Sequence, residues 1–275
     1  MGTRVSLGGN LFGLALGPLA AGLLADHAPW PLRLPYVFCI ALLVVATILV
    51  WRSKETKEHA QPPEPETFAP RLAVPRSIRA PFIGSAVAAF ATFSVLGFYS
   101  ALLPSLLRQS LQISSPAVAG CVVAGLFFVA TATLALVPAW EPRRGMIYGL
   151  GLLIPATILL VVADATHSLS MLLVATGLGG VASGLGYLFG LQSLNEIAPE
   201  DQRAAVVSSY LIVCYAAISL PVVGIGIVSS LWAPLLAMAV FGGIIALVAV
   251  AALLFEIFGT PAGRRRHGAL LGAAR

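Results

Sequence analysis

Residues 204–228 read AAVVSSYLIVCYAAISLPVVGIGIV, a stretch without a charged residue or a histidine. A helix rises about 1.5 Å per residue, so about 20 apolar residues cross a hydrocarbon core of roughly 30 Å. Seven further uncharged stretches occupy residues 5–25, 34–51, 81–107, 116–140, 145–163, 169–192 and 233–255. The sequence therefore predicts an all-α polytopic membrane protein with eight transmembrane helices.

The composition supports a membrane location and argues against a soluble fold. The chain is 59% hydrophobic and 10% charged, whereas a typical soluble domain is about 25% charged. Its net charge of +5 does not indicate a nucleic-acid partner, because the basic residues lie in short loops and a tail. There they are expected to face anionic lipid, so the bilayer is the expected partner.

The distribution of Lys and Arg predicts the orientation of the helices. When the eight stretches alternate across the bilayer, Arg33 and Arg108 fall on one side and the other fourteen of the sixteen basic residues on the opposite side. Lys and Arg are retained on the cytoplasmic side. We therefore expect a multi-pass protein of the plasma (inner) membrane with both termini in the cytoplasm. Cleavage of residues 5–25 as a signal peptide is the disfavoured alternative, because that stretch is long and rich in glycine.

One long connection divides the chain into two helices and six. Residues 52–80 contain Pro62, Pro63, Pro65, Pro70 and Pro75 among ten charged residues. Such a segment buries too little apolar surface to order itself. We expect residues 1–51 to form one unit, 52–80 a cytoplasmic linker, 81–256 a six-helix unit and 257–275 a basic cytoplasmic tail that includes Arg264, Arg265 and Arg266.

Residues 13–22 read GLALGPLAAG. This string resembles the G-x-x-x-G-P-x-x-G-G signature on the fifth helix of major facilitator superfamily transporters, particularly their drug and metabolite antiporters. Gly13 and Gly17 are expected to let another backbone approach closely, and Pro18 to bend the helix beside the central cavity. With Gly22 they form the expected bending and gating motif. The chain departs from the signature at Arg4, which occupies the upstream glycine position, and at Ala21, which replaces a glycine.

Two connections strengthen the resemblance. Residues 140–145, WEPRRG, resemble the degenerate basic turn of the second half of these transporters, and residues 195–203, NEIAPEDQR, resemble the connection before their eleventh helix. Members of the superfamily have twelve helices in two related halves. The resemblance thus implies a partial fold, with two helices of the N-terminal half and a complete six-helix C-terminal half, corresponding to helices five to twelve.

The resemblance implies transport of a small organic solute by a secondary transporter, most simply by efflux coupled to protons. The charged positions of the first four helices that carry much of this coupling are not in the sequence. No predicted stretch contains a mid-membrane carboxylate, which is the usual mark of an ion pathway. Asp164 and Glu256 lie at the ends of stretches, where we expect the membrane interface to solvate them. We therefore expect that this chain does not transport on its own.

Candidate solute contacts are the polar and aromatic residues near the middle of the helices that the resemblance places around the cavity. A pocket of aromatic groups with few polar ones suits an amphipathic organic solute. The alternative reading is that the same residues pack against neighbouring helices or lipid. The candidates are Asn10, Phe90, Ser94, Phe98, Tyr187 and Tyr215.

Other functions are less favoured. His27, His59, His167 and His267 are scattered singly, and Cys39, Cys121 and Cys214 lie inside apolar stretches without ligand spacing. We expect no catalytic residue, metal or cofactor, and so no enzyme. An uptake permease for a metabolite and a non-transporting membrane scaffold or assembly subunit remain as alternatives.

Overall fold

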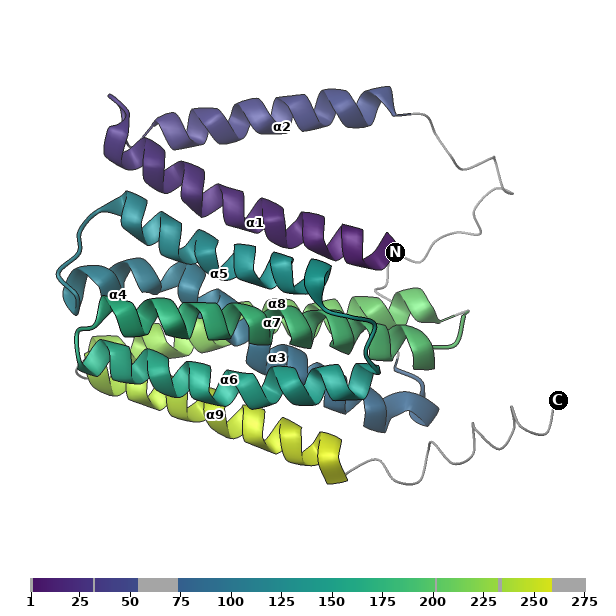
Figure 1. Ribbon diagram of the computed structural model, residues 1–275. Coiled ribbons are helices and arrows are strands. Elements are labelled where there is room, and N and C mark those ends of the chain that lie inside the picture. Colours follow the sequence, from purple (N-terminus) through teal and green to yellow (C-terminus); the bar gives the residue numbers. More distant parts are fainter. Residues whose placement is uncertain (1, 32, 54–73, 201, 232–233, 259–275) are drawn as a thin grey trace, which may run out of the picture.

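The computed structural model describes residues 2–31, 33–53, 74–200, 202–231 and 234–258 (Figure 1). Most of the expected linker and the whole of residues 259–275, with their three consecutive arginines, lie outside the described residues. The described residues form helices and contain no strand. The helices are α1 (Gly2–His27), α2 (Leu34–Arg52), the short 3-10 helix η1 (Arg76–Ile78), α3 (Arg79–Ala101), α4 (Leu103–Gln109), α5 (Pro116–Leu136), α6 (Pro142–Ala165), α7 (Leu169–Ile197), α8 (Arg203–Leu231) and α9 (Pro234–Phe258).

The predicted fold class is confirmed. Eight of the described helices, all but η1 and α4, are long and apolar enough to cross a membrane. They run side by side, and the start of α1 and the end of α9 lie at the same end of the bundle (Figure 1). An even number of spans requires this arrangement.

The third predicted stretch differs from the expectation of one continuous helix over 81–107. Helix α3 ends at Ala101, and α4 begins at Leu103. Pro104 lies in the first turn of α4, where its missing N–H is not needed, whereas in the interior of a helix its ring would clash with the carbonyl four residues earlier. A new helix, α4, therefore begins beside the proline in place of a continuation of α3.

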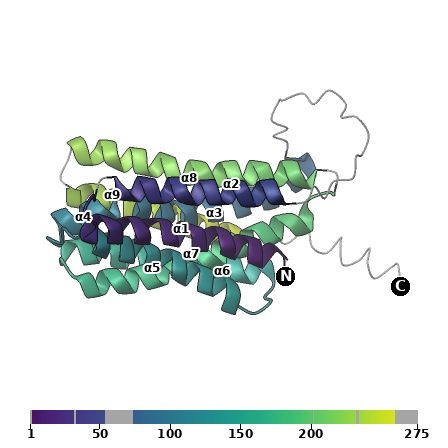
Figure 2. The same ribbon diagram turned by 90° about the horizontal axis from the view of Figure 1, so that it is seen from above.

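Helices α3 and α7 form the centre of the bundle. In the most apolar 18-residue window of the span that contains α3, 78% of the residues are buried inside the protein. In the corresponding window of α7, 72% are buried. Helices α5, α6, α8 and α9 surround them. Helix α1 packs chiefly along α5, and α2 lies outside α1 with no buried residue (Figures 1 and 2).

Charged residues at the two ends of α1 form hydrogen bonds with groups at the two ends of α5. The Arg4 guanidinium donates a 2.7 Å hydrogen bond to the carbonyl oxygen of Val137, which follows the last turn of α5. At the other end, the Asp26 carboxylate accepts hydrogen bonds from the Ser115 hydroxyl and, at 3.0 Å, from the Ala117 N–H. A cation at a helix C-terminus and an anion at its N-terminus are the favourable arrangement. The arginine that departs from the glycine signature thus caps a neighbouring helix.

The expected solvation of Asp164 and Glu256 at the membrane interface is wrong for the described structure. Their exposed fractions are 3% and 5%. Helix α6 continues to Ala165 and α9 to Phe258, so both acids lie within helices rather than beyond them, and neighbouring elements cover both side chains.

Candidate functional site

The structure brings three of the six candidate residues together across three helices. Asn10 on α1 shares a side-chain hydrogen bond with Tyr187 on α7, and Tyr215 on α8 lies close enough to interact electrostatically with Tyr187. Asn10 and Tyr215 are exposed, Tyr215 to 66%, whereas Tyr187 is 4% exposed. We call Asn10, Tyr187 and Tyr215 the polar cluster.

Aromatic packing holds the central tyrosine of the polar cluster. The rings of Phe93 and Tyr187 meet edge to face with centroids 4.9 Å apart, a favourable geometry for aromatic pairs. Because the ring is fixed in this way, the Tyr187 hydroxyl is held toward α1. The candidate Phe90 lies about one turn before Phe93 on α3 and is half-buried against the core.

The other two candidates lie away from the polar cluster. Ser94 is fully buried and its hydroxyl donates a 2.6 Å hydrogen bond to the carbonyl oxygen of Phe90, so its proton is already used. Phe98 is 1% exposed and stacks on Phe241 of α9 with ring centroids 4.9 Å apart. Phe98 lines a separate cavity at the end of the bundle formed by α4 and the end of α6.

The glycine–proline string packs differently from the expectation. Within the described residues, nothing lies within 4 Å of a Cβ placed at Gly13 or Gly17, whereas one at Gly22 would lie 2.5 Å from the Pro116 carbonyl oxygen and 3.2 Å from the Gly120 Cα. The buried stripe of α1 passes through residues 7, 11, 15 and 22, and positions 13 and 17 lie off that stripe. The close approach is therefore made by Gly22.

The small residues of α7 pack against two sides of the bundle. A Cβ at Gly180 would lie 2.7 Å from the Leu126 carbonyl oxygen, and one at Gly184 would lie 2.8 Å from that of Ala130, both on α5. A Cβ at Gly186 would meet Thr92 of α3 at 2.5 Å, and one at Gly190 would meet the Tyr210 hydroxyl of α8 at 2.6 Å. Glycine on these faces lets three helices approach α7 closely.

Two features of the structure were not found from the sequence. Tyr210 is fully buried and faces Gly190, and Asp164 lines the cavity that contains Phe98. A single aspartate at the end of an apolar stretch gives no local signal of burial, because burial depends on which helices cover it.

The polar cluster presents neutral hydrogen-bonding groups. Two phenol hydroxyls and one carboxamide lie among apolar helices, and the Cys214 thiol of α8 also lies close enough to interact electrostatically with Tyr187. Among the described residues, no group of three or more His, Cys, Asp or Glu side chains is placed to hold a metal ion. A few polar groups on apolar walls are typical of sites that orient an organic molecule.

The described helices form an all-helical, multi-pass membrane protein, an architecture that solute transporters share. In a comparison with known families, the sequence model of the Major Facilitator Superfamily matches residues 4–220. The chain belongs to this superfamily of membrane transporters. A search of curated proteins finds no match to the chain.

Proposed function

We propose that the chain forms the fifth to twelfth helices of a secondary transporter that exports a small organic solute in exchange for protons. The observation that carries the proposal is the hydrogen bond between Asn10 and Tyr187, which joins a helix of the first pair to the centre of the six-helix unit. In transporters built from two halves, the solute site lies between the halves near the middle of the membrane.

The composition of the polar cluster supports an amphipathic solute. Tyr187 and Tyr215 each offer a ring and a hydroxyl, and Asn10 offers both a donor and an acceptor. Phe93 and Phe90 extend the aromatic surface along α3. A flat organic molecule with one or two polar groups matches such a surface better than an inorganic ion does. In this proposal, Phe98 and Ser94 support the site only by packing within the bundle.

The orientation and location belong to the same proposal. Both ends of the described chain lie at one end of the bundle (Figure 1). The described basic residues at the helix ends on that side are Arg4, Arg52, Arg76, Arg79, Arg143, Arg144 and Arg203. We place that end in the cytoplasm and the chain in the plasma membrane. Uptake in place of export, and a scaffold role without transport, are the competing functions.

Binding to the purified protein tests the solute site. Ethidium, an amphipathic aromatic cation, is expected to bind in detergent solution with saturable fluorescence anisotropy. Tyr187→Phe keeps the ring and removes the hydroxyl, so it is expected to weaken binding by about tenfold, the value of one hydrogen bond of roughly 1.4 kcal/mol.

Tyr148→Phe is the matched control, because Tyr148 is an exposed tyrosine on α6 that packs beside Trp140. It should bind ethidium as the unmodified protein does. Equal affinities for all three proteins would remove the polar cluster from the proposed site, and an absence of binding by any amphipathic solute would favour the scaffold.

Transport in liposomes tests whether the chain by itself couples solute movement to protons. The polar cluster contains no carboxylate that could exchange a proton, so the reconstituted chain is expected not to accumulate ethidium when a pH gradient is imposed. Accumulation that collapses when the gradient is dissipated would contradict this expectation and show that the described helices suffice for coupled transport.

A further inference from the structure

A cavity with an unpaired buried carboxylate lies at the end of the bundle opposite the start of α1. It is partly open and provides about 80 Å³ of space between α3, α4, α6, α8 and α9. A water molecule needs only about 10–15 Å³ on the same measure, so the cavity has room for a small organic group. Its polar lining residues are Ser105, Gln109, Ser110, Asp164 and Ser229.

Asp164 is the charged residue of this lining. Its exposed fraction is 3%, and its Oδ1 atom is buried without a hydrogen-bond partner. Among the described residues, no Lys or Arg nitrogen lies within 4 Å of the Asp164 carboxylate, and the ion pair between Arg144 and Glu141 is at the other end of α6. A buried carboxylate without a partner is strongly unfavourable, and a positively charged group beside it would relieve that cost.

The other polar groups of the cavity favour a ligand that donates hydrogen bonds. The Ser105 hydroxyl donates to the Leu102 carbonyl oxygen at 2.7 Å, and the Ser229 hydroxyl donates to that of Gly226 at 2.9 Å. With their protons used in this way, both oxygens present only lone pairs to the cavity. Together with the Asp164 carboxylate, they supply three acceptors, while the Gln109 carboxamide in the same lining offers both a donor and an acceptor.

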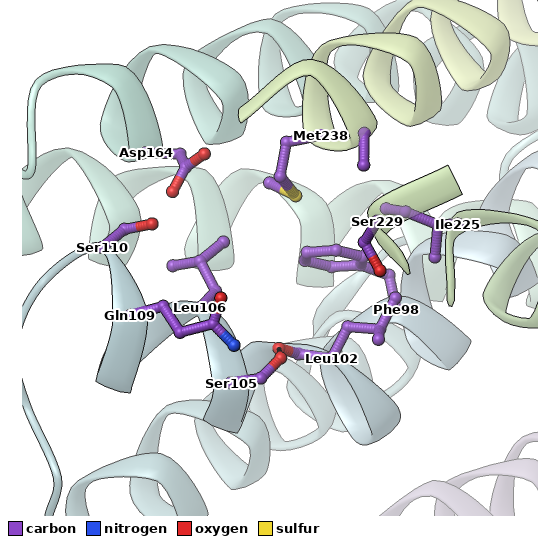
Figure 3. A pocket seen from close by; sticks show the side chains of 11 residues that line it. Phe98, Leu102, Ser105, Leu106, Gln109, Ser110, Asp164, Ile225, Ser229 and Met238 are labelled. Atoms are coloured by element: carbon purple, nitrogen blue, oxygen red, sulfur yellow. Dashed lines mark hydrogen bonds between the residues drawn. The ribbon is translucent and has the colours of Figure 1, made fainter. Parts of the chain in front are cut away.

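The apolar lining distinguishes an organic cation from a metal ion. Phe98 and Met238 line the cavity across from the Asp164 carboxylate and the Ser110 hydroxyl (Figure 3). A hard metal ion requires about six oxygen ligands, whereas an ammonium group is satisfied by a carboxylate and two hydroxyl oxygens. An aromatic face and a thioether are also favourable neighbours for an alkylammonium.

We propose that this cavity binds a primary ammonium group, with the Asp164 carboxylate as its counter-ion. The ammonium belongs either to a free alkylamine or to the headgroup of an ethanolamine phospholipid, since both present the same –NH3⁺ group at the end of a short carbon chain. The site is separate from the polar cluster and does not depend on the proposed export function.

Thermal unfolding of the whole chain in phosphatidylcholine nanodiscs tests the proposal, with tryptophan fluorescence as the signal. Ethylammonium chloride at neutral pH is expected to raise Tm saturably by about 3 °C, the size of shift that a ligand well above its Kd gives a protein of this length. Sodium chloride at the same ionic strength and ethanol, the neutral analogue of the same shape, should give no such rise.

Two variants assign the effect to the cavity. Asp164→Asn preserves the shape of the side chain, removes its charge and is expected to weaken ethylammonium binding at least tenfold. Asp26→Asn is the matched control, because Asp26 is an exposed aspartate outside the cavity lining, and it should retain the full Tm rise. If Asp164→Asn does not fold, Ser229→Leu fills the cavity from an exposed position and should also abolish the rise.

Nanodiscs of phosphatidylethanolamine distinguish the two sources of the ammonium. If the lipid headgroup occupies the cavity, these nanodiscs raise Tm without added amine, and Asp164→Asn loses that rise. If the ligand is a free amine, the two lipids give the same Tm and ethylammonium acts equally in both. The proposal is overturned if neither amine nor lipid shifts Tm, if sodium chloride shifts it equally, or if Asp164→Asn shifts as the unmodified protein does.

Discussion

Gly180→Leu is expected to destabilise the six-helix unit by about 3 kcal/mol, the upper range for overpacking. A Cβ at Gly180 would lie 2.7 Å from the Leu126 carbonyl oxygen and 2.8 Å from the Val129 Cβ. These atoms belong to the backbone and to a β-branched side chain, so neither can rotate away. Helices α5 and α7 must separate, and the free energy of unfolding in sodium dodecyl sulfate, followed by tryptophan fluorescence, measures the loss.

Gly177→Leu is the control within the same helix, since nothing lies within 4 Å of a Cβ at Gly177. Leucine also has a higher helix propensity than glycine, so this variant should be neutral or slightly more stable. Equal losses for both variants would mean that α5 and α7 do not approach each other as described.

Gly22→Leu is expected to release α1 from α5 with a cost of about 2 kcal/mol. The added Cβ would lie 2.5 Å from the Pro116 carbonyl oxygen and 3.2 Å from the Gly120 Cα. Release separates the buried stripe of α1, which includes the fully buried Ala15, from α5. The free energy of unfolding in sodium dodecyl sulfate, followed by tryptophan fluorescence, should fall by that amount.

Gly17→Leu separates this effect from any general change in α1. Among the described residues, nothing lies within 4 Å of a Cβ at position 17, so its variant should keep the unfolding free energy of the unmodified protein. A Gly17→Leu variant that loses as much unfolding free energy as Gly22→Leu would contradict the assignment of Gly22 as the point of close approach.

The family signature was predictable from the sequence, but the role of each of its residues was not. The string at residues 13–22 indicated close helix packing, and close packing occurs at Gly22 but, among the described residues, not at Gly13 or Gly17. The sequence shows which positions carry small residues. Which of them face a neighbour depends on the rotation of α1, which the contacts of Leu11 and Ala15 with the core determine.

The candidate site was predictable to a similar extent. The sequence selected Asn10, Tyr187 and Tyr215 as polar or aromatic residues in apolar helices, and the structure brings these three together. It could not separate them from Ser94 and Phe98, because residues at the same depth in a helix point in different directions. Whether the polar cluster binds solute stays a prediction.

The sequence by itself determined that the chain is a membrane protein with eight spanning helices. The length of each stretch and its lack of charge are local properties, and they decide whether that stretch is stable as a helix in the hydrocarbon core. Only the tertiary structure decided which groups are buried. Asp164 and Asp26 both end apolar stretches, yet one is enclosed in a cavity and the other caps α5 at the surface. The physical reason is that burial and hydrogen bonding of a side chain depend on neighbouring helices that are distant in sequence, and no single stretch encodes them.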